Sequence, residues 1–299
     1  RALFEAPAAE IVLMSTGSSA NALALATMTP PFAAVYCHPE SHVNVDECGA
    51  PEFYTGGAKL VPVEGQHAKI SVEALESAIT GAGVVHHVQP AAVSVTQVTE
   101  AGTLYTLEEL WAISDICKRH ELKLHMDGAR FANAIEALGC TPAACSHELG
   151  VDALSFGATK NGAMCAEAIL FFDPVLAREA GYRRKRAGHL FSKMRFLSAQ
   201  FDAYLADDLW RRNARHANAM AARLAAGLEA IPDVEFASPV EANELFVRLP
   251  VAVIKGLLEA GFLFYRWEPD GTLIRMVTAF DTAAADVEAF IEAAQRLAG

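Results

Sequence analysis

The stretch Leu122-Lys123-Leu124-His125-Met126-Asp127-Gly128-Ala129-Arg130 decides the fold of this chain. It is typical of an apolar strand that ends in a carboxylate and leads at once into a helix of small residues. Open α/β sheets keep their ligand crevices at the carboxyl ends of their strands. A carboxylate there is costly to bury unless a cation faces it. Taken singly, Asp127 is equally well explained as the cap of a helix over 129–138, with Arg130 as its ion-pair partner.

Similar apolar runs recur on both sides of this stretch. They are nearly continuous, which is typical of strands covered on both faces of a parallel sheet. Besides the run over 122–126, the expected strands are Ile11–Met14, Ala33–Cys37, Ala91–Val95, Ala153–Phe156 and Ala168–Phe172.

Amphipathic segments separate the expected strands. Residues 107–120 place apolar side chains at helical spacing, and Thr106 with Glu109 has the pattern of a capping box. Gly139 is placed to end the helix over 129–138. The alternation of strands and helices predicts an α/β domain with a mostly parallel central sheet flanked by helices.

The pattern changes after residue 173. Two long helical stretches, about 190–206 and 208–230, are interrupted only by Asp207-Asp208. Strands are expected near 243–248, 262–266 and 272–277, followed by a helix over 283–298. We therefore expect a large α/β domain over residues 1–207 and a smaller α+β domain over residues 208–299.

Composition narrows the class of protein. The chain has 299 residues and a formal net charge of −12, which disfavours nucleic acid and anionic membranes as partners. No apolar run approaches the ~20 residues that span a bilayer, and the first residues do not resemble a signal peptide. The six cysteines form no CxxC pair, so we expect reduced thiols in a cytoplasmic protein.

The segment Thr16-Gly17-Ser18-Ser19-Ala20-Asn21 follows the first expected strand and opens a helix. A glycine there lets the backbone approach an anion, and the free N–H groups of a helix start point along its axis. Taken alone, the segment is better explained by ordinary helix capping. The segment is neither a Walker A loop nor G-x-G-x-x-G, which argues against a nucleotide.

A lysine follows the next expected strand, in Ser155-Phe156-Gly157-Ala158-Thr159-Lys160-Asn161-Gly162. A lysine in a loop is usually a solvated charge. Lys160, however, comes directly after an apolar strand, where partial desolvation lowers the pKa of an ammonium as a Schiff-base lysine requires.

These three features together predict a site for pyridoxal 5′-phosphate (PLP). This cofactor needs a grip on its phosphate, an acid beside its pyridinium nitrogen and an amine for its aldehyde. Asp127 would keep the ring nitrogen protonated, and Lys160 would hold the aldehyde. Lys160 follows Asp127 by 33 residues, which leaves room for one helix and one strand.

The segments 15–21, 125–130 and 155–160 together resemble the PLP-dependent low-specificity L-threonine aldolases. These enzymes belong to the β-eliminating lyase group of the aspartate aminotransferase fold, fold type I. Variation around Gln97-Val98-Thr99-Glu100 and Lys160-Asn161-Gly162 resembles the phenylserine aldolase branch most closely. The resemblance implies a fold type I large domain and a carbon–carbon lyase that releases glycine and an aldehyde from threonine, allo-threonine or phenylserine.

The resemblance also implies roles for individual residues. His42 matches the histidine that stacks on the cofactor ring and moves protons at the β-hydroxyl. Arg130 and Arg275 match residues that hold the substrate carboxylate. Gly17 and Ser18 match the phosphate-binding turn, and Lys185 or Arg186 is a candidate for a phosphate contact from a neighbouring subunit.

Two departures from the family pattern are visible. Several threonine aldolases have a second active-site histidine where this chain has Thr99, so that Gln97 is expected to face the cofactor instead. The family also carries a few dozen residues before the phosphate cradle, whereas this sequence starts inside the pattern. The resemblance further implies a homodimer or homotetramer with active sites at the subunit interface.

Other functions are less compatible with these residues. A β-eliminating lyase or an aminotransferase on the same scaffold is the main alternative, followed by a binding protein without activity. A nucleotide-dependent oxidoreductase would need the missing glycine fingerprint. Cysteine, histidine and aspartate gather over 37–48, but with no CxxC or HExxH spacing, so we expect no metal site.

Overall fold

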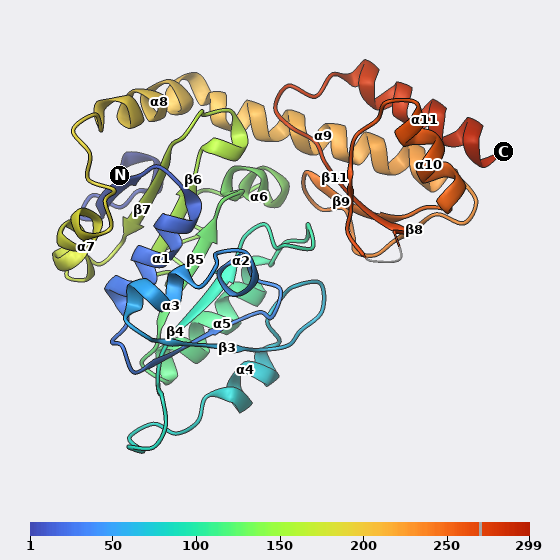
Figure 1. Cartoon of the computed structure of the whole chain (residues 1–299). Helices are drawn as coiled ribbons and strands as arrows, with labels where there is room; N and C mark the ends of the chain where they lie inside the picture. Colours follow the sequence, from blue (N-terminus) through green and yellow to red (C-terminus); the bar gives the residue numbers. More distant parts are fainter. Residues whose placement is uncertain (269–270) are drawn as a thin grey trace.

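The computed structural model describes residues 1–268 and 271–299 of the chain. Its largest element is a seven-stranded sheet in the order β1-β7-β6-β5-β4-β2-β3 (Figure 1). The strands are β1 (Glu10–Met14), β2 (Ala33–Cys37), β3 (Lys59–Pro62), β4 (Gln89–Thr96), β5 (Lys123–Gly128), β6 (Ala153–Gly157) and β7 (Glu167–Phe171).

The strands from β6 to β3 run parallel, whereas β7 runs antiparallel to both of its neighbours, β6 and β1. Every residue of β2, β6 and β7 is buried, as expected for strands covered on both faces. The predicted α/β class with a largely parallel sheet is therefore confirmed.

Helices cover both faces of this sheet. On one face, α1 (Gly17–Met28) packs against β5, β6 and β7 and against α3 (Ala50–Thr55) and α7 (Ala180–Arg186). On the other face lie α4 (Val72–Ala78), α5 (Leu107–Arg119) and α6 (Phe131–Leu138). Each face has its own core of buried apolar side chains. The short helix α2 (His42–Val45) follows β2 at the carboxyl edge of the sheet.

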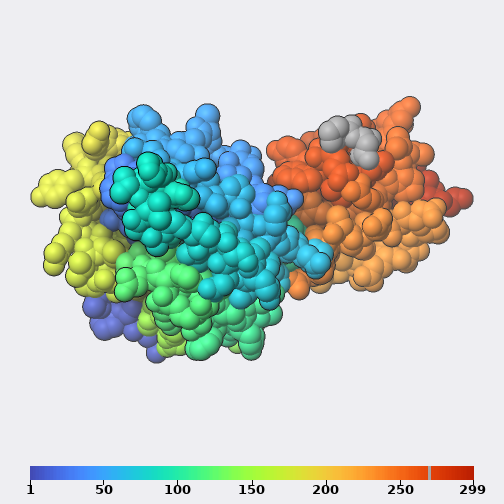
Figure 2. Space-filling model, turned by 90° about the horizontal axis from the view of Figure 1, so that it is seen from below, coloured from blue at the N-terminus to red at the C-terminus, as the bar shows by residue number. Residues whose placement is uncertain are grey.

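A smaller lobe follows the connecting helices α8 (Arg195–Leu205), η4 (Ala206–Asp208) and α9 (Leu209–Glu229). Its antiparallel sheet has the order β10-β11-β9-β8 and packs against two further helices. These elements are β8 (Glu235–Phe236), β9 (Glu244–Arg248), α10 (Val251–Glu259), β10 (Tyr265–Arg266), β11 (Leu273–Val277) and α11 (Ala284–Ala298). Figure 2 shows the small lobe, orange to red, beside the larger one.

Several elements differ from the sequence expectation. The edge strand β3 was not expected, because its residues Lys59-Leu60-Val61-Pro62 are exposed or half-buried and form no apolar run. The helix expected over 190–206 is confined to α8, since residues 187–194 form a turn-rich segment after α7. The expected domain boundary falls within η4, where Asp207 and Asp208 adopt left-handed backbone angles, and remains a prediction. None of the helices in the described part of the chain is both long and apolar enough to cross a bilayer.

Candidate active site

Two strand ends bring the expected acid and lysine together. β5 and β6 are parallel neighbours, with Asp127 opposite Ser155, and the turn η2 (Thr159–Asn161) follows β6 directly. A β-carbon at Gly128 would lie 2.8 Å from the carbonyl oxygen of Ser155, and one at Gly157 would lie 2.6 Å from that of Ala129. Two glycines therefore permit the close approach of backbone that gathers Asp127 and Lys160 at one edge.

Asp127 is 3% exposed, and both of its carboxylate oxygens accept hydrogen bonds. Oδ1 accepts from the backbone N–H of Ala129 at 2.9 Å, which lies before the N-cap residue of α6, Arg130, so the interpretation of Asp127 as the cap of that helix needs correction. Oδ2 accepts from the side-chain amide of Asn21 at 2.7 Å. Each oxygen retains acceptor capacity, and Asp127 lines a cavity of about 390 Å³.

His42 lines the same cavity and is fixed by a buried carboxylate. Its Nδ1 lies 2.9 Å from Oε1 of Glu47, and the same oxygen accepts from the amide of Asn21 at 2.9 Å. A chain of hydrogen bonds thus joins His42 to Glu47, Asn21 and Asp127. The hydrogen bond to Glu47 raises the pKa of His42, and burial raises the pKa of Glu47.

Lys160 extends into this cavity and stays exposed to it. Partial desolvation by the surrounding protein lowers the pKa of Lys160, and the nearby charge of Arg130 lowers it further. Asp127 opposes part of this shift. An amine whose neutral form is favoured in this way is suited to attack a carbonyl group.

The start of α1 borders the cavity on another side. The hydroxyl of Thr16 caps the helix by accepting from the backbone N–H of Ser19 at 3.2 Å, so the capping interpretation holds. The N–H groups of Gly17 and Ser18 lie in the first turn, where a helix offers no internal acceptor. A β-carbon at Gly17 would meet nothing within 4 Å, which leaves room for an anion.

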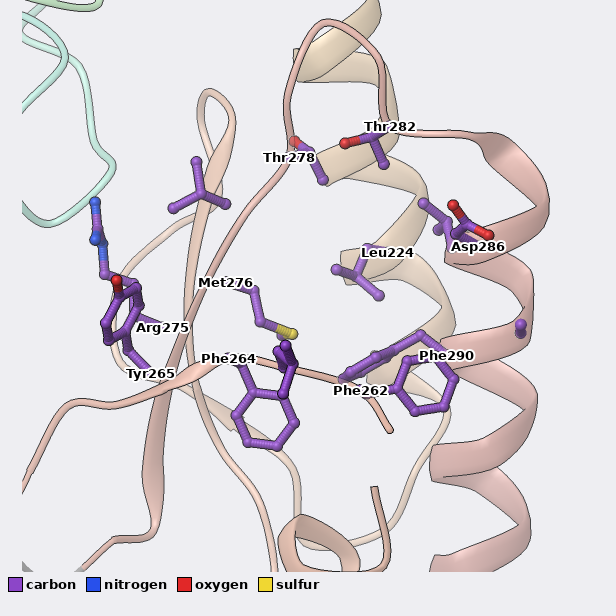
Figure 3. Close-up of a pocket in the computed structure, with 14 residues that line it drawn as sticks. Leu224, Phe262, Phe264, Tyr265, Arg275, Met276, Thr278, Thr282, Asp286 and Phe290 are labelled. Atoms are coloured by element: carbon purple, nitrogen blue, oxygen red, sulfur yellow. The ribbon is translucent and has the colours of Figure 1, made fainter. Parts of the chain in front are cut away.

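The two expected carboxylate-binding arginines converge from different lobes. Arg130 precedes α6 in the large lobe, and Arg275 lies on β11 of the small lobe. Arg275 lies at the edge of a second, apolar cavity lined by Phe262, Met276 and Phe290, and Figure 3 shows its side chain extending away from the two rings. Both arginines line a cavity of about 800 Å³ that also contains His42 and Lys160.

Glu244 joins the two arginines. Its Oε1 lies 3.0 Å from a terminal nitrogen of Arg130 and accepts from Nε of Arg275 at 3.1 Å. A terminal nitrogen of Arg275 also donates to the same oxygen. The Glu244 side chain is 1% exposed, and its Oε2 is buried without a hydrogen-bond partner among the described residues.

Gln97, in contrast, is not placed in the site. Its side chain is fully buried, and its amide bonds the backbone N–H and carbonyl of Tyr105 at 3.0 and 2.9 Å. The expectation that Gln97 faces the cofactor therefore needs correction, because both ends of the amide hold the turn after β4. Thr99 is also fully buried and bonds Thr103.

Glu100, next along the chain, borders the larger cavity instead. Its Oε1 accepts from the backbone N–H of His42 at 2.7 Å and from the hydroxyl of Thr96 at 2.9 Å. Burial raises the pKa of Glu100 to about 7. Glu100 therefore supports the backbone at the start of α2, from which His42 projects.

The remaining candidates lie outside this cavity. Lys185 and Arg186 belong to α7 and are exposed, so a phosphate contact from a neighbouring subunit remains a prediction. Within residues 1–268 and 271–299, no cluster of three potential metal ligands is formed. His125, inside the most specific motif, bonds the hydroxyls of Ser94 and Ser155, and burial lowers its pKa to about 4.

Sequence reasoning missed several of the site's carboxylates, among them Glu47, Glu244 and Glu167 of β7. The role of Glu47 could not be predicted, because no motif distinguishes it from its neighbours in 44–48. It is identified through its contact with His42. Glu244 offered a usable signal, since it is the charged residue that opens the apolar strand Glu244-Leu245-Phe246-Val247. A carboxylate in a buried strand requires a cation nearby.

Known proteins share both the sequence and the fold. The family model described as beta-eliminating lyase matches residues 1–251. A low-specificity L-threonine aldolase of Pseudomonas sp. is 42% identical over 96% of this chain and 82% of its own length. Its counterpart in Pseudomonas aeruginosa is 43% identical over 99% and 84%. The structure of a Leishmania major threonine aldolase superposes with a TM-score of 0.94 and 34% identity, covering all of this chain and 87% of the other.

Proposed function

Because this chain belongs to the beta-eliminating lyase family, we propose that it is a PLP-dependent threonine aldolase. It cleaves a β-hydroxy-α-amino acid into glycine and an aldehyde, as a carbon–carbon lyase. Relatives named as threonine aldolases, more than 40% identical over nearly the whole chain, support this activity over the other reactions of the same fold.

The observation that carries the proposal is one shared cavity. Lys160, Asp127, His42 and the first turn of α1 all line the cavity of about 390 Å³. These groups fit PLP, since an amine, an acid with spare acceptor capacity and an open helix start face the same space. When bound there, PLP supplies an aldehyde that captures amines and a ring that accepts an electron pair from Cα.

The residues of the chain divide the binding task. Lys160 is placed to hold the aldehyde carbon, and Asp127 is placed to keep the ring nitrogen protonated. Gly17 and Ser18 offer backbone N–H groups to the phosphate. Because Asn21 donates to Asp127 at 2.7 Å, the carboxylate is held in one orientation.

Arg130 and Arg275 orient the substrate. Because the substrate amine would be held by the cofactor, anchoring its carboxylate on guanidinium groups prevents rotation about the N–Cα bond, and this fixes which bond at Cα breaks. The two arginines approach from separate lobes. Binding of the carboxylate therefore also holds the small lobe against the large one.

His42 is placed to take the proton from the substrate's β-hydroxyl. Glu47 contacts Nδ1 and thereby favours the tautomer with the proton on Nδ1, which leaves Nε2 as the acceptor. When the Cα–Cβ bond breaks, the hydroxyl oxygen becomes the aldehyde oxygen and its proton stays on Nε2 of His42. Lys160 is placed to return a proton to Cα, which yields glycine.

The proposal includes the oligomeric state of the protein and its location in the cell. Tyr182, Leu190 and Phe196 are large apolar residues exposed on α7, α8 and the segment between them. Their exposure supports a homodimer or homotetramer in which this face is covered. A cytoplasmic location is part of the proposal and awaits measurement.

A spectrum combined with a product assay tests the function. The purified holoprotein should absorb visible light, borohydride should bleach that absorption, and Lys160→Ala should abolish both features. Threonine and phenylserine should each release glycine, with a loss of about 10³-fold or more in Lys160→Ala. The exposed Lys255→Ala serves as the matched control and should behave as wild type.

The products decide among the alternatives. Pyruvate and ammonia would indicate a β-eliminating lyase, and a transferred amino group would indicate an aminotransferase. A wild-type protein that stays colourless after incubation with PLP would contradict the cofactor assignment altogether.

A further inference from the structure

Glu244 occupies an acceptor position between the two guanidinium groups that face the substrate. Arg130 and Arg275 both bind its Oε1, and neither is paired with another carboxylate among the described residues. The Glu244 carboxylate thus stands where a second anionic group of a substrate would otherwise find two cations. The chain supplies this anion itself, from the first residue of β9.

The net charge of the two arginines and Glu244 is balanced by one further anion. Two arginines and Glu244 together carry one net positive charge, which a single substrate carboxylate neutralises. Apart from three histidines, His38, His42 and His67, the other basic side chain that lines the larger cavity in the described part of the chain is Lys160, which the proposed function assigns to the cofactor.

Further carboxylates line the same cavity. Glu40, Asp46 and Glu64 line it with exposed carboxylates, and no salt bridge to any of them is present among the described residues. A second carboxylate on the substrate's β-substituent would face these groups or Glu244. Like charges in a cleft with low-dielectric walls repel one another more strongly than in bulk water.

We propose that Glu244 is a specificity-determining positioning residue that restricts the enzyme to substrates with one carboxylate. The inference rests on the proposed function and deepens it by naming the substrate class. β-Hydroxy-α-amino acids with neutral side chains are accepted, and dicarboxylic ones such as β-hydroxyaspartate are rejected. Glu244 acts through Arg130 and Arg275, whose shared contact keeps their remaining N–H groups directed at one carboxylate.

A pair of ligands that differ only in charge tests this inference. L-Asparagine and L-aspartate have nearly the same shape, and both lack the β-hydroxyl that the cleavage requires. Their binding to the holoenzyme is measured by titrating the visible absorption of the cofactor. We expect wild type to bind asparagine at least 10-fold more tightly than aspartate, and Glu244→Gln to reduce that ratio by at least 10-fold.

Two further variants separate charge from structure. Glu244→Asp retains the anion and should keep most of the discrimination. Glu136 also bridges two arginines, Arg211 and Arg215, but does so between α6 and α9 away from the cavity. Glu136→Gln is therefore the matched control and should leave the asparagine-to-aspartate ratio unchanged.

A second substitution, with a smaller side chain, is used if Glu244→Gln does not fold. Glu244→Ala should also lose the discrimination, and added formate should restore it by replacing the missing carboxylate. Turnover gives a second readout, since kcat/KM for β-hydroxyaspartate relative to threonine should rise at least 10-fold in Glu244→Gln. If Glu244 had only a structural role, the substitution would lower kcat/KM for β-hydroxyaspartate and kcat/KM for threonine together.

The outcomes distinguish the inference from the proposed function. Equal binding of asparagine and aspartate by wild type, or an unchanged ratio in Glu244→Gln, overturns the role of Glu244 while glycine release from threonine still supports the aldolase. If neither amino acid nor glycine changes the absorption, and threonine yields no glycine, the proposed function itself fails.

Discussion

His42 and Glu47 form the pair on which proton transfer depends in the proposed mechanism. A buried carboxylate at 2.9 Å from Nδ1 does two things to an imidazole. It orients the ring, and it stabilises the protonated form, so that the pKa of His42 rises. His42 is therefore a stronger base, but because its pKa is higher it is unprotonated, and able to accept a proton, only at a higher pH.

Glu47→Gln should separate these effects. The neutral amide still accepts a hydrogen bond from Nδ1, but it no longer stabilises the imidazolium charge. Removal of that charge lowers the pKa of His42, so the acid limb of the kcat/KM profile for threonine should move to lower pH. We expect kcat to fall about 10-fold, less than the ~10²–10⁴-fold that a general base contributes, because the base is kept but accepts the hydroxyl proton less readily.

A surface pair provides the control for this experiment. Glu76 lies 2.8 Å from Nε2 of His120, far from the cavity, so Glu76→Gln removes a comparable contact. Its pH profile should match that of wild type. If Glu47→Gln also leaves the acid limb in place, His42 does not control that limb.

At the scale of residues, local signals predicted only part of the site. Asp127 and Lys160 were identifiable because each directly follows an apolar strand, and the two line one cavity. Glu244 and Arg130 lie far apart along the chain, so their contact depends on how the two lobes meet. Gln97 was misassigned because its two bonds to Tyr105 arise from a turn geometry that no motif encodes.

At the scale of elements, α5 illustrates what local sequence determines. Its capping box was predicted and is formed, with the Thr106 hydroxyl 3.1 Å from the N–H of Glu109 and the Glu109 carboxylate 2.7 Å from the N–H of Thr106. One side of the helix is buried through Leu110, Ile113 and Cys117. The cap was therefore predicted in full from consecutive residues, whereas Trp111, expected on the same apolar stripe as Leu110 and Cys117, is 57% exposed.

Removal of this cap should measurably lower the free energy of unfolding. Thr106→Ala leaves the N–H of Glu109 without its side-chain acceptor, and we expect the free energy of unfolding to fall by about 1 kcal/mol. Urea denaturation followed by circular dichroism measures the change. Thr106→Ser keeps the hydroxyl and should lose at most about half as much, whereas equal losses would show that the threonine methyl group, not the cap, stabilises α5.

Elements at the margins of the fold were less predictable. β3 is an edge strand whose residues are half-buried or exposed, so its pairing with β2 replaces the missing apolar signal. β8 and β10 contain two residues each and exist only through their pairing with β9 and β11. In each case the neighbouring strand determines the structure, and a single sequence does not reveal that neighbour.

At the scale of the whole molecule, α9 connects the two lobes. Its first half packs against α6 of the large lobe, and its second half packs against α11 of the small lobe. Buried Trp210 joins the core of the large lobe, whereas Leu224 and Leu228 join that of the small lobe. We propose that the domain boundary lies near residue 207, with α9 holding the lobes at the spacing that lets Glu244 of the small lobe reach Arg130 of the large lobe.

The stability of the whole molecule should depend on pH through Glu167. This carboxylate of β7 is 6% exposed and lines the cavity with Lys160, and burial raises its pKa to about 7. The folded protein therefore keeps a proton that the unfolded chain releases above about pH 4.5, so the stability falls as the pH rises from about 4.5 to 7.

Glu167→Gln should remove this dependence, since the amide has no charge to desolvate. We expect the variant holoenzyme to exceed wild type in unfolding free energy by about 1–3 kcal/mol at pH 8, and by much less at pH 5. Thermal denaturation at the two pH values measures the difference. Glu229→Gln, at the exposed end of α9, should show no such gap. A Glu167→Gln protein equal to wild type at pH 8 would mean that Lys160 or the bound cofactor compensates the buried carboxylate fully.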